Sequence, residues 1–482
     1  MQHIKNIKFA KSGSSNSLII GLYKETSKGE TENGAVTFVR SGSYLLDFYA
    51  QAGAMRKNPD QALVLFKKAF SEDNLSAIRI LFYLRDVRGG QGERDLFRIC
   101  LEWLGTDEPE IFEKIIGYVS EYGRWDDLFF DNPECFDLIK KQIEIDLDTD
   151  KPSLLAKWLP TINASSSTTK AKARFMAKKL GMNGMEYRKT IRRIRKQIET
   201  VEEKMSDNKW GKINYSTVPS QASKIYKNAF KKHDEERYDK FIEKAEKGEV
   251  KINASTLYPY QIYNSVERDY SKTLEALWNQ LPDYTQGKNA MVVADCSGSM
   301  CGDPMSVSVS LALYFAERNK GQFHNYFMTF SDDCQLQEVV GKTLKEKMYN
   351  IEKDGYCGST NIQSVFDTIL KTGLDNNVPQ KEMPSTIYII SDMEFNGACS
   401  YHTNFEVIEK KYKNCGYEMP TLVFWNVDAR SGKNLPVQVG KDGVVMVSGF
   451  SPVIFKMAVE NKSPEQVMMD TINSERYSKI VI

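Results

Sequence analysis

The spacing of apolar residues changes once along this chain, close to residue 285. Between about 40 and 280, apolar residues recur every three or four positions, as they do on the buried face of an α-helix. Clear examples are the runs 63–70 and 75–84, and turn-forming pairs such as Asn58-Pro59 separate such runs. This pattern predicts short helices in antiparallel pairs, which is typical of an α-solenoid.

After residue 285, short apolar runs alternate with helical patterns. The apolar runs predict strands at 290–294, 326–330, 386–391, 421–427 and 444–447. The helical patterns lie at 304–318, 344–352, 361–371, 404–413, 451–459 and 464–473. Strands and helices that alternate in this way form a doubly wound α/β domain with a largely parallel sheet. The fold class we expect is therefore an α-helical repeat region followed by an α/β domain.

These patterns divide the chain into three parts. Residues 1–34 are polar and rich in Gly, Ser, Lys and Glu, and we expect an arm with one short strand near 18–23. The helical-repeat domain is expected at 35–284 and the α/β domain at 285–482. No apolar run approaches the roughly 20 residues that a membrane-spanning helix needs, and we see no secretory leader, so we expect no membrane contact.

Oxygen-bearing side chains follow the first predicted strand of the α/β region. The sequence DCSGS at 295–299 places one carboxylate and two hydroxyls on a tight loop. Thr360 follows a glycine-containing loop that opens a helix, and Asp392 ends another predicted strand. Strand ends in an open parallel sheet share one edge, so these side chains can converge on one ion. The candidate metal ligands are Asp295, Ser297, Ser299, Thr360 and Asp392.

This set of side chains favours a hard divalent cation. Carboxylate and hydroxyl oxygens suit Mg²⁺, with Mn²⁺ or Ca²⁺ able to take its place, whereas zinc prefers nitrogen and sulfur ligands. Two aspartates neutralise the ion and the hydroxyls add no charge, so the ion can still bind a carboxylate or phosphate oxygen from outside. Cys296 lies between two ligands and has no histidine nearby in sequence, so we interpret it as a small residue packed behind the loop rather than a catalytic thiol.

With these motifs, the region from about 285 to 482 resembles the von Willebrand factor A family. The DxSxS loop, Thr360 and Asp392 match the family's metal-ion-dependent adhesion site position by position. The resemblance implies that the two serines and the threonine contact the metal directly or through water, and that the second aspartate is often water-bridged. It also implies that an acidic group of a partner fills the open position on the metal.

Composition narrows the picture a little further. The chain has 65 Lys and Arg against 64 Asp and Glu, so its net charge of +1 indicates no general preference for a polyanion. Eight cysteines are scattered without a CxxC pair, which disfavours a zinc site or a disulfide framework and favours a reducing compartment. We therefore expect a cytoplasmic protein, and we expect it to be a monomer.

One segment departs strongly from this charge balance. Between 170 and 196 there are eleven basic residues and a single acid, Glu186. A stripe of one sign on a pair of helices is typical of a surface that binds RNA or DNA. A solvated helix face, or one that binds an acidic protein, would have the same charge. The basic residues are Lys170, Lys172, Arg174, Lys178, Lys179, Arg188, Lys189, Arg192, Arg193, Arg195 and Lys196.

Two other motifs lie in the helical region. RDVRGGQGER at 85–94 is a bend rich in glycine and arginine. It either binds phosphate or pairs its arginines with Asp86 and Glu93 to fix a corner between helices. GRWDDL at 123–128 predicts a second corner, with its tryptophan as a packing anchor.

These motifs, with INYSTVPS at 213–220 and KINAS at 251–255, resemble a family of unknown function that joins a TROVE-like helical region to an A domain. TROVE proteins include the Ro autoantigen. The resemblance implies a HEAT-like ring or horseshoe that carries the A domain. It also implies that small structured RNAs bind the basic outer face and that single-stranded ends of misfolded RNAs enter the central hole, but it assigns no individual RNA contact.

The function we expect is a non-enzymatic scaffold that binds small structured or misfolded RNA and has a Mg²⁺-dependent adhesion site for an acidic partner. A first alternative is a metal-dependent adaptor that binds proteins without RNA, with an AAA+ ATPase as one such partner. A second alternative is a Mg²⁺-dependent phosphoryl-transfer enzyme or nuclease. That chemistry usually needs several carboxylates and often two metals, whereas here hydroxyls dominate and Glu394 is the one extra acid nearby in sequence.

Overall fold

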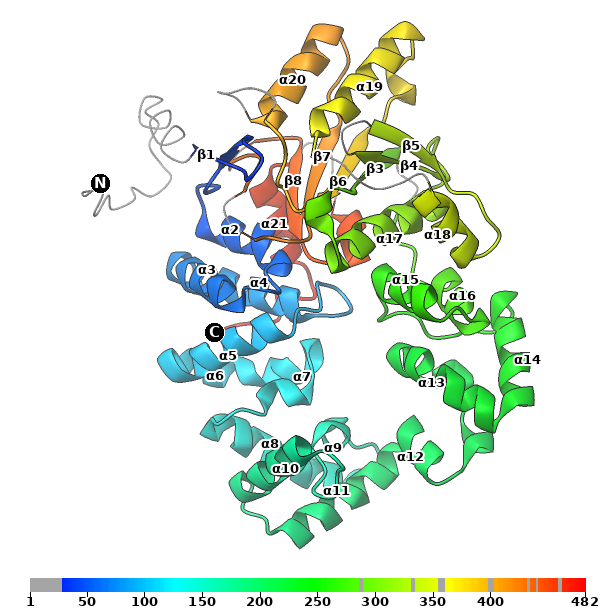
Figure 1. Cartoon of the computed structure of the whole chain (residues 1–482). Helices are drawn as coiled ribbons and strands as arrows, with labels where there is room; N and C mark the ends of the chain where they lie inside the picture. Colours follow the sequence, from blue (N-terminus) through cyan, green and yellow to red (C-terminus); the bar gives the residue numbers. More distant parts are fainter. Residues whose placement is uncertain are drawn as a thin grey trace.

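The computed structural model describes residues 28–285, 289–330, 334–353, 360–397, 403–430, 434–438, 441–457 and 462–482. A body of helices carries a six-stranded sheet with its own helices (Figure 1). The helices of the body are α2 (Tyr44–Gln51), α3 (Pro59–Glu72), α4 (Asn74–Arg85), α5 (Asp95–Asp107), α6 (Pro109–Ile115), α7 (Val119–Tyr122), α8 (Pro133–Leu147), α9 (Leu155–Trp158), α10 (Ser167–Lys179), α11 (Gly184–Ile198), α12 (Val201–Ser206), α13 (Ser220–His233), α14 (Glu235–Glu246), α15 (Pro259–Arg268) and α16 (Lys272–Asn279).

The helices of the body begin and pack as the apolar spacing predicts. Pro59 stands in the first turn of α3, and the Asn132 side chain caps α8 by accepting a hydrogen bond from the Cys135 N–H at 3.2 Å. Neighbouring helices contact one another, as α3 does with α2, α4 and α5. Many of their apolar side chains are fully buried, with Phe66 and Phe82 as large core side chains, whereas Leu63 and Leu65 are partly buried. The predicted helical region is therefore confirmed. None of the helices in the described ranges is long and apolar enough to cross a membrane.

The C-terminal region contains one mixed sheet in the order β5-β4-β3-β6-β7-β8. Its strands are β3 (Ala290–Asp295), β4 (Tyr326–Phe330), β5 (Cys334–Glu338), β6 (Thr386–Ser391), β7 (Thr421–Asn426) and β8 (Val444–Ser448). All neighbouring pairs are parallel except β4 with β5. The helices of this region are α17 (Asp303–Arg318), α18 (Leu344–Lys353), α19 (Ile362–Asp375), α20 (Asn404–Cys415) and α21 (Pro464–Ile472).

All five predicted strands are present, and β5 was missed. β5 is an edge strand whose sequence CQLQE is mostly polar and exposed, so no apolar run marks it. The predicted helix at 451–459 is a short 3₁₀ helix over Pro452–Lys456. Its Phe455 packs against Tyr388 of β6 and Trp425 of β7, with ring centroids 5.0 Å apart in both pairs. This 3₁₀ helix therefore covers part of one face of the sheet.

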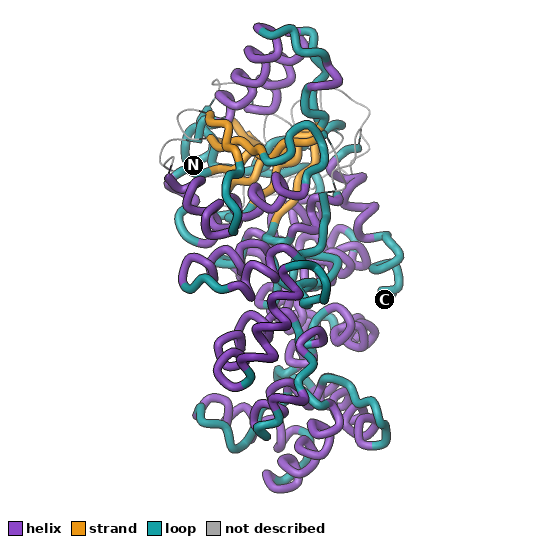
Figure 2. The backbone as a smooth tube through the Cα atoms, turned by 90° about the vertical axis from the view of Figure 1, so that its right-hand side faces the viewer, coloured by secondary structure: helices purple, strands orange, loops and turns teal. Residues whose placement is uncertain are grey.

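The helical body meets the α/β region at both of its ends. At one end α2 contacts β8 and α21, and α4 also contacts α21. At the other end α15 contacts α17 and α18. The elements therefore form a closed circuit that runs out through the helices and back to the sheet (Figure 1). Seen from the side, the strands gather in the upper half of an elongated molecule and the helical body extends below them (Figure 2).

Residues 28–38, which precede α2, also belong to the α/β region. Strands β1 (Lys28–Glu30) and β2 (Val36–Phe38) form an antiparallel hairpin. Isolated β-bridges join this hairpin to the α/β region, pairing Gly34 with Asn396 and Phe38 with Leu435. The hairpin crosses the boundary predicted between the arm at 1–34 and the helical domain at 35–284, because β2 lies within the range predicted for the helical domain. The strand predicted near 18–23 lies outside the described residues.

The glycine- and arginine-rich bend is a structural corner, with different ion pairs from those predicted. Asp86 accepts a hydrogen bond at 2.9 Å from Arg476, close to the C-terminus, and another at 3.0 Å from the Tyr477 hydroxyl. Glu93 accepts hydrogen bonds at 2.9 Å from Arg56. The bend therefore joins α4 to the C-terminal tail. The local sequence of the bend has no feature that indicates a partner so far along the chain.

Arg85 of the bend joins the two corner motifs to each other. Its guanidinium pairs with the Asp127 carboxylate at 2.7 Å, and both side chains are buried. Arg98 adds a second ion pair to Asp127, also at 2.7 Å. Removing one partner of a buried pair leaves the other charge in an apolar environment, which is costly.

We expect Asp127→Ala to lower the free energy of unfolding by about 3–5 kcal/mol, because it leaves the buried Arg85 guanidinium without its partner. Asp126→Ala is the matched control, since Asp126 pairs with half-buried arginines at the surface and should contribute about 0–1 kcal/mol. Urea unfolding of both variants measures the difference. Equal losses for the two variants would contradict the role given to the buried pair.

Candidate metal site and basic surface

The candidate metal ligands lie at the point of the sheet where the strand order reverses, because successive strands are added on opposite sides of it. Strands β3 and β6 are central neighbours, and the chain proceeds outward from them on opposite sides. Asp295 is the last residue of β3, and Asp392 directly follows β6. The Ser391 hydroxyl donates to Asp295 Oδ2 at 2.6 Å, which ties the two strand ends together. In open parallel sheets, ligands bind in the crevice at this position.

The loop after β3 holds two hydroxyls at the spacing of neighbouring metal ligands. The Ser297 N–H donates to Asp295 Oδ1 at 2.9 Å, which bends the loop back over the strand end. Ser297 Oγ and Ser299 Oγ are 3.1 Å apart. Adjacent ligands in an octahedron with Mg²⁺–oxygen bonds near 2.1 Å are separated by about 3.0 Å. The two hydroxyls can therefore both contact one Mg²⁺ ion without moving far.

Thr360 lies on a third loop at the same edge of the sheet. The Asn396 N–H donates to the Thr360 carbonyl at 2.9 Å, so the loop before α19 is bonded to the loop after β6. Asn361 caps α19 by accepting from the Ser364 N–H, which fixes the residue next to Thr360. The Thr360 side chain is buried. The rest of the predicted loop, at 355–359, lies outside the described residues.

The carboxylates at this edge are buried, and little positive charge lies nearby to balance their negative charge. Asp295 is 0% exposed, and burial followed by the charge of Asp392 raises the pKa of Asp295 to about 7. Burial also raises the pKa of Asp392, which is 1% exposed. Asp392 Oδ2 has no hydrogen-bond partner among the described residues. A buried acidic oxygen of this kind is costly unless a cation or a donor is supplied.

Arg430 is a functional residue that the sequence analysis missed. Its guanidinium lies 3.7 Å from Asp392 Oδ2 and 3.4 Å from Asp428 Oδ2, and it donates to the Ser299 carbonyl. Arg430 follows β7, whose C-terminal end shares the edge of β3 and β6. Its position after a predicted parallel strand was the signal that could have found it. This partly exposed arginine supplies some of the positive charge that the site needs.

The other chemically active groups near the site are engaged or neutral. Cys296 is buried, and burial raises the pKa of its thiol well above the usual value, as suits a side chain packed behind the loop. Glu394 is also buried, and its carboxylate accepts hydrogen bonds from the Glu32 N–H and the Asn434 amide. His324 lies away from the site: it hydrogen-bonds the Asn319 carbonyl at 2.7 Å, and the Asn319 amide donates to the Ala290 carbonyl at the start of β3, opposite the end that carries Asp295. His402 lies outside the described residues.

The donor set determines which metal fits. Among the described residues no group of three or more His, Cys, Asp or Glu side chains is arranged to hold a metal. The candidate ligands at this edge are the carboxylates of Asp295 and Asp392 and the hydroxyls of Ser297, Ser299 and Thr360. Such a set suits Mg²⁺ and does not suit zinc. The five predicted ligand positions fit this description, with hydroxyl spacing and buried charge as the two observations in its favour.

The basic residues at 170–196 lie on α10 and α11, and most face solvent. Nine of the eleven are exposed, and these are Lys172, Arg174, Lys178, Lys179, Arg188, Lys189, Arg192, Arg193 and Lys196. Several apolar side chains of the same helices are buried, with Met176 and Ile194 nearly inaccessible, whereas Met185 is exposed. We call the nine exposed residues the basic surface. Lys179 pairs with Asp131, which reduces its free charge.

Arg195 has a structural role instead. It is half-buried, and its guanidinium donates to the Ala156 carbonyl and to the Thr161 hydroxyl, both at 2.7 Å. It also donates to the Leu159 carbonyl, and burial lowers its pKa. These bonds attach α11 to the segment after α9. We therefore leave Arg195 out of the basic surface, and Lys170, which is partly buried, as well.

Comparisons with known proteins match both halves of the chain. The family model described as domain of unknown function DUF2828 matches residues 31–114 and 137–295. The model described as domain of unknown function DUF7788 matches residues 289–479. A relative from Acanthamoeba polyphaga mimivirus, named Uncharacterized protein L728, is 28% identical over 496 residues, which is 92% of this chain and 86% of the relative. Neither model description tests the resemblance to TROVE proteins or to A domains.

We expect Mg²⁺ to stabilise the protein and Asp295→Asn to abolish that effect. An ion present at 100 times its Kd should raise the free energy of unfolding by about 2.7 kcal/mol, and EDTA should remove the gain. Urea unfolding with and without Mg²⁺ measures it. Asp375→Asn is the control, because Asp375 is exposed at the far end of α19 and should keep the full gain. An undiminished Mg²⁺ effect in Asp295→Asn would refute the site.

Proposed function

Because this chain belongs to the family described as domain of unknown function DUF2828, we propose a function from its own sites: a non-enzymatic scaffold that binds RNA on its helical body and an acidic partner through Mg²⁺ in its α/β region. The observation that carries the proposal is a buried oxygen of Asp392 that has no hydrogen-bond partner among the described residues. The negative charge of Asp392 also raises the pKa of Asp295. A cation at that position would offset the cost of burying both carboxylates.

We assign the α/β region to the von Willebrand factor A type, with a metal-ion-dependent adhesion site. The strand order with its reversal between β3 and β6 is that of a doubly wound fold, which supports the assignment. The ligand loops are those that the family uses. Bound Mg²⁺ would offer a coordination position to a carboxylate or phosphate oxygen from outside. Ser297, Ser299 and Thr360 would hold the ion, and Asp295 and Asp392 would balance its charge.

A non-enzymatic role fits the groups around the site. A hydrolytic reaction needs a base or nucleophile that is free to act. Within the described ranges, the Cys296 thiol is buried with a raised pKa, and Glu394 already accepts two hydrogen bonds. Groups that are buried or hydrogen-bonded in this way suit a site that binds a partner rather than one that hydrolyses a substrate.

RNA binding is supported by the basic surface on α10 and α11. Nine exposed Lys and Arg side chains on adjacent helices would contact several phosphates at once. The overall net charge of +1 means that this attraction is local to one part of the molecule. The TROVE-like architecture supports RNA over DNA as the ligand. The closed circuit of helices and sheet agrees with the ring that this resemblance implies.

We expect the triple variant Arg192→Gln, Arg193→Gln and Lys196→Gln to weaken binding of a labelled hairpin RNA with a single-stranded tail. Each lost phosphate contact should flatten the slope of log K against log salt by about 0.7–0.9. Fluorescence anisotropy over a salt series measures both the affinity and the slope.

The matched control removes the same charge from exposed lysines of the α/β region, as Lys345→Gln, Lys371→Gln and Lys381→Gln. This control should keep the wild-type slope. An unchanged slope in the α11 variant would exclude that surface from the RNA interface. A wild-type protein that binds no RNA but binds an acidic peptide in Mg²⁺ would indicate the adaptor function instead.

A further inference from the structure

The hairpin formed by β1 and β2 has a compact turn with polar side chains at its tip. The Gly34 N–H donates to the Thr31 carbonyl at 3.0 Å, and the Thr31 N–H donates to the Ala35 carbonyl at 2.9 Å. Gly34 has a φ of 78°, which glycine adopts without strain. Glu32 and Asn33 are exposed between these bonds. The turn therefore holds one carboxylate and one amide at its tip.

The tip lies directly on the candidate metal site. The Asn33 amide donates to Thr360 Oγ1 at 3.1 Å and to the Glu394 carbonyl at 2.6 Å. The Glu32 N–H donates to Glu394 Oε2 at 2.7 Å. One of the five proposed ligands, Thr360, thus accepts a hydrogen bond from a residue 327 positions earlier in the chain.

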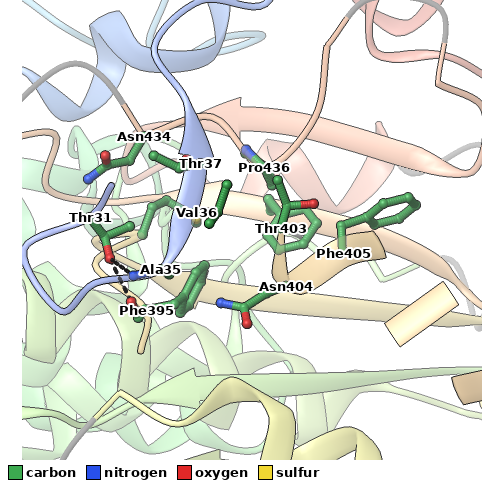
Figure 3. A pocket seen from close by; sticks show the side chains of 12 residues that line it. Thr31, Ala35, Val36, Thr37, Phe395, Thr403, Asn404, Phe405, Asn434 and Pro436 are labelled. Carbon is green, nitrogen blue, oxygen red and sulfur yellow. Dashed lines mark hydrogen bonds between the residues drawn. The ribbon is translucent and has the colours of Figure 1, made fainter. Parts of the chain in front are cut away.

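The rest of the hairpin is attached through both side chains and backbone, and the Thr37 hydroxyl also donates to the Leu435 carbonyl at 3.0 Å. Thr31 Oγ1 donates to the Phe395 carbonyl at 2.7 Å, and Phe38 and Leu435 exchange backbone hydrogen bonds at 2.9 and 3.1 Å. Side chains of the hairpin also pack over Phe395, with the Thr31 bonds visible in Figure 3. The space left between them is about 20 Å³, which is room for roughly one water. Backbone pairing of this kind accepts extended segments of varied sequence.

Charge makes this contact incomplete without a cation. Glu32 is exposed at the tip of the hairpin, and its N–H donates to the Glu394 carboxylate, so the hairpin brings a further carboxylate close to an acidic edge. This edge already contains the buried carboxylates of Asp392 and Glu394. Carboxylates that crowd together repel one another unless a positive ion lies among them. A bound Mg²⁺ would turn this repulsion into attraction between the hairpin and the sheet edge.

We propose that this edge is a docking site for an extended acidic segment, and that the chain's own hairpin Lys28–Phe38 occupies it, so that an outside partner of the same chemistry binds by displacing the hairpin. The proposal rests on the proposed metal site, because the ion links Glu32 to the edge. Metal and hairpin then strengthen each other by the same factor, as linkage requires. The outside partner is an acidic extended peptide segment that offers a carboxylate near a tight turn.

Hydrogen exchange of the full chain tests the proposal. In the wild type, Mg²⁺ should slow exchange of the hairpin amides by at least about fivefold, the lower end of usual coupling between sites. Glu32→Gln should lose this protection. Glu30→Gln removes the same charge two residues away, where the side chain is exposed on β1, and should keep it. A synthetic peptide that copies 28–38, added in excess, should restore fast exchange in the presence of Mg²⁺.

Three results would overturn the proposal. In the first, Mg²⁺ stabilises the protein against urea but does not change the hydrogen exchange of the hairpin amides. That result would support the metal site and exclude the hairpin as its internal partner. The second is equal protection in Glu32→Gln and the wild type. The third is a peptide that leaves exchange slow. If Mg²⁺ neither stabilises the protein nor protects the hairpin, the metal site itself fails and the proposal fails with it.

Discussion

Two carboxylates are buried at the carboxyl edge of the sheet, and the properties of the candidate metal site follow from their burial. Asp295 and Asp392 end neighbouring strands, and backbone pairing fixes their positions whatever their charges. Burial disfavours the ionised form of both side chains, and their mutual repulsion adds to that cost. Arg430 offsets only part of it from 3.7 Å away. The fold therefore buries negative charge at one place, and the metal ion that we propose there would offset this cost.

The closed course of the chain explains why distant segments meet at this place. The helical body meets the sheet through α2 and returns to the α/β region through α15, which contacts α17 and α18. The hairpin before α2 reaches the sheet edge at which we propose the metal site. Buried ion pairs such as that of Arg85 with Asp127 hold the corners of the body. The metal edge and the basic surface are consequently carried by one connected framework. This arrangement suits a scaffold that holds two kinds of ligand at separate places.

The sequence alone predicted those strands and helices that a local pattern of apolar residues determines. The strand ending in Asp295 is a continuous apolar run, and its neighbours in a parallel sheet must end at the same edge, so the loops of Asp295 and Asp392 could be placed at one edge from the sequence alone. The helices of the body followed from their apolar spacing in the same way. β5 was missed because a polar edge strand has no such run.

Contacts between distant residues had no sequence signal. Asn33 reaches Thr360 across 327 positions, and Asp86 binds Arg476 across 390. Arg195 carried the same charge as its neighbours in the sequence, and its bonds to backbone carbonyls distinguish it from them only in the folded chain. Charge and residue type indicate which groups can act, but burial and partners decide which of them are free to do so.

Diffraction from crystals grown with Mn²⁺ tests the central claim most directly, because the anomalous signal locates the ion itself. The account predicts one peak among Ser297, Ser299 and Thr360, within direct or water-mediated reach of Asp295 and Asp392. A fully occupied peak elsewhere, or crystals at saturating Mn²⁺ with no peak at this edge, would contradict it.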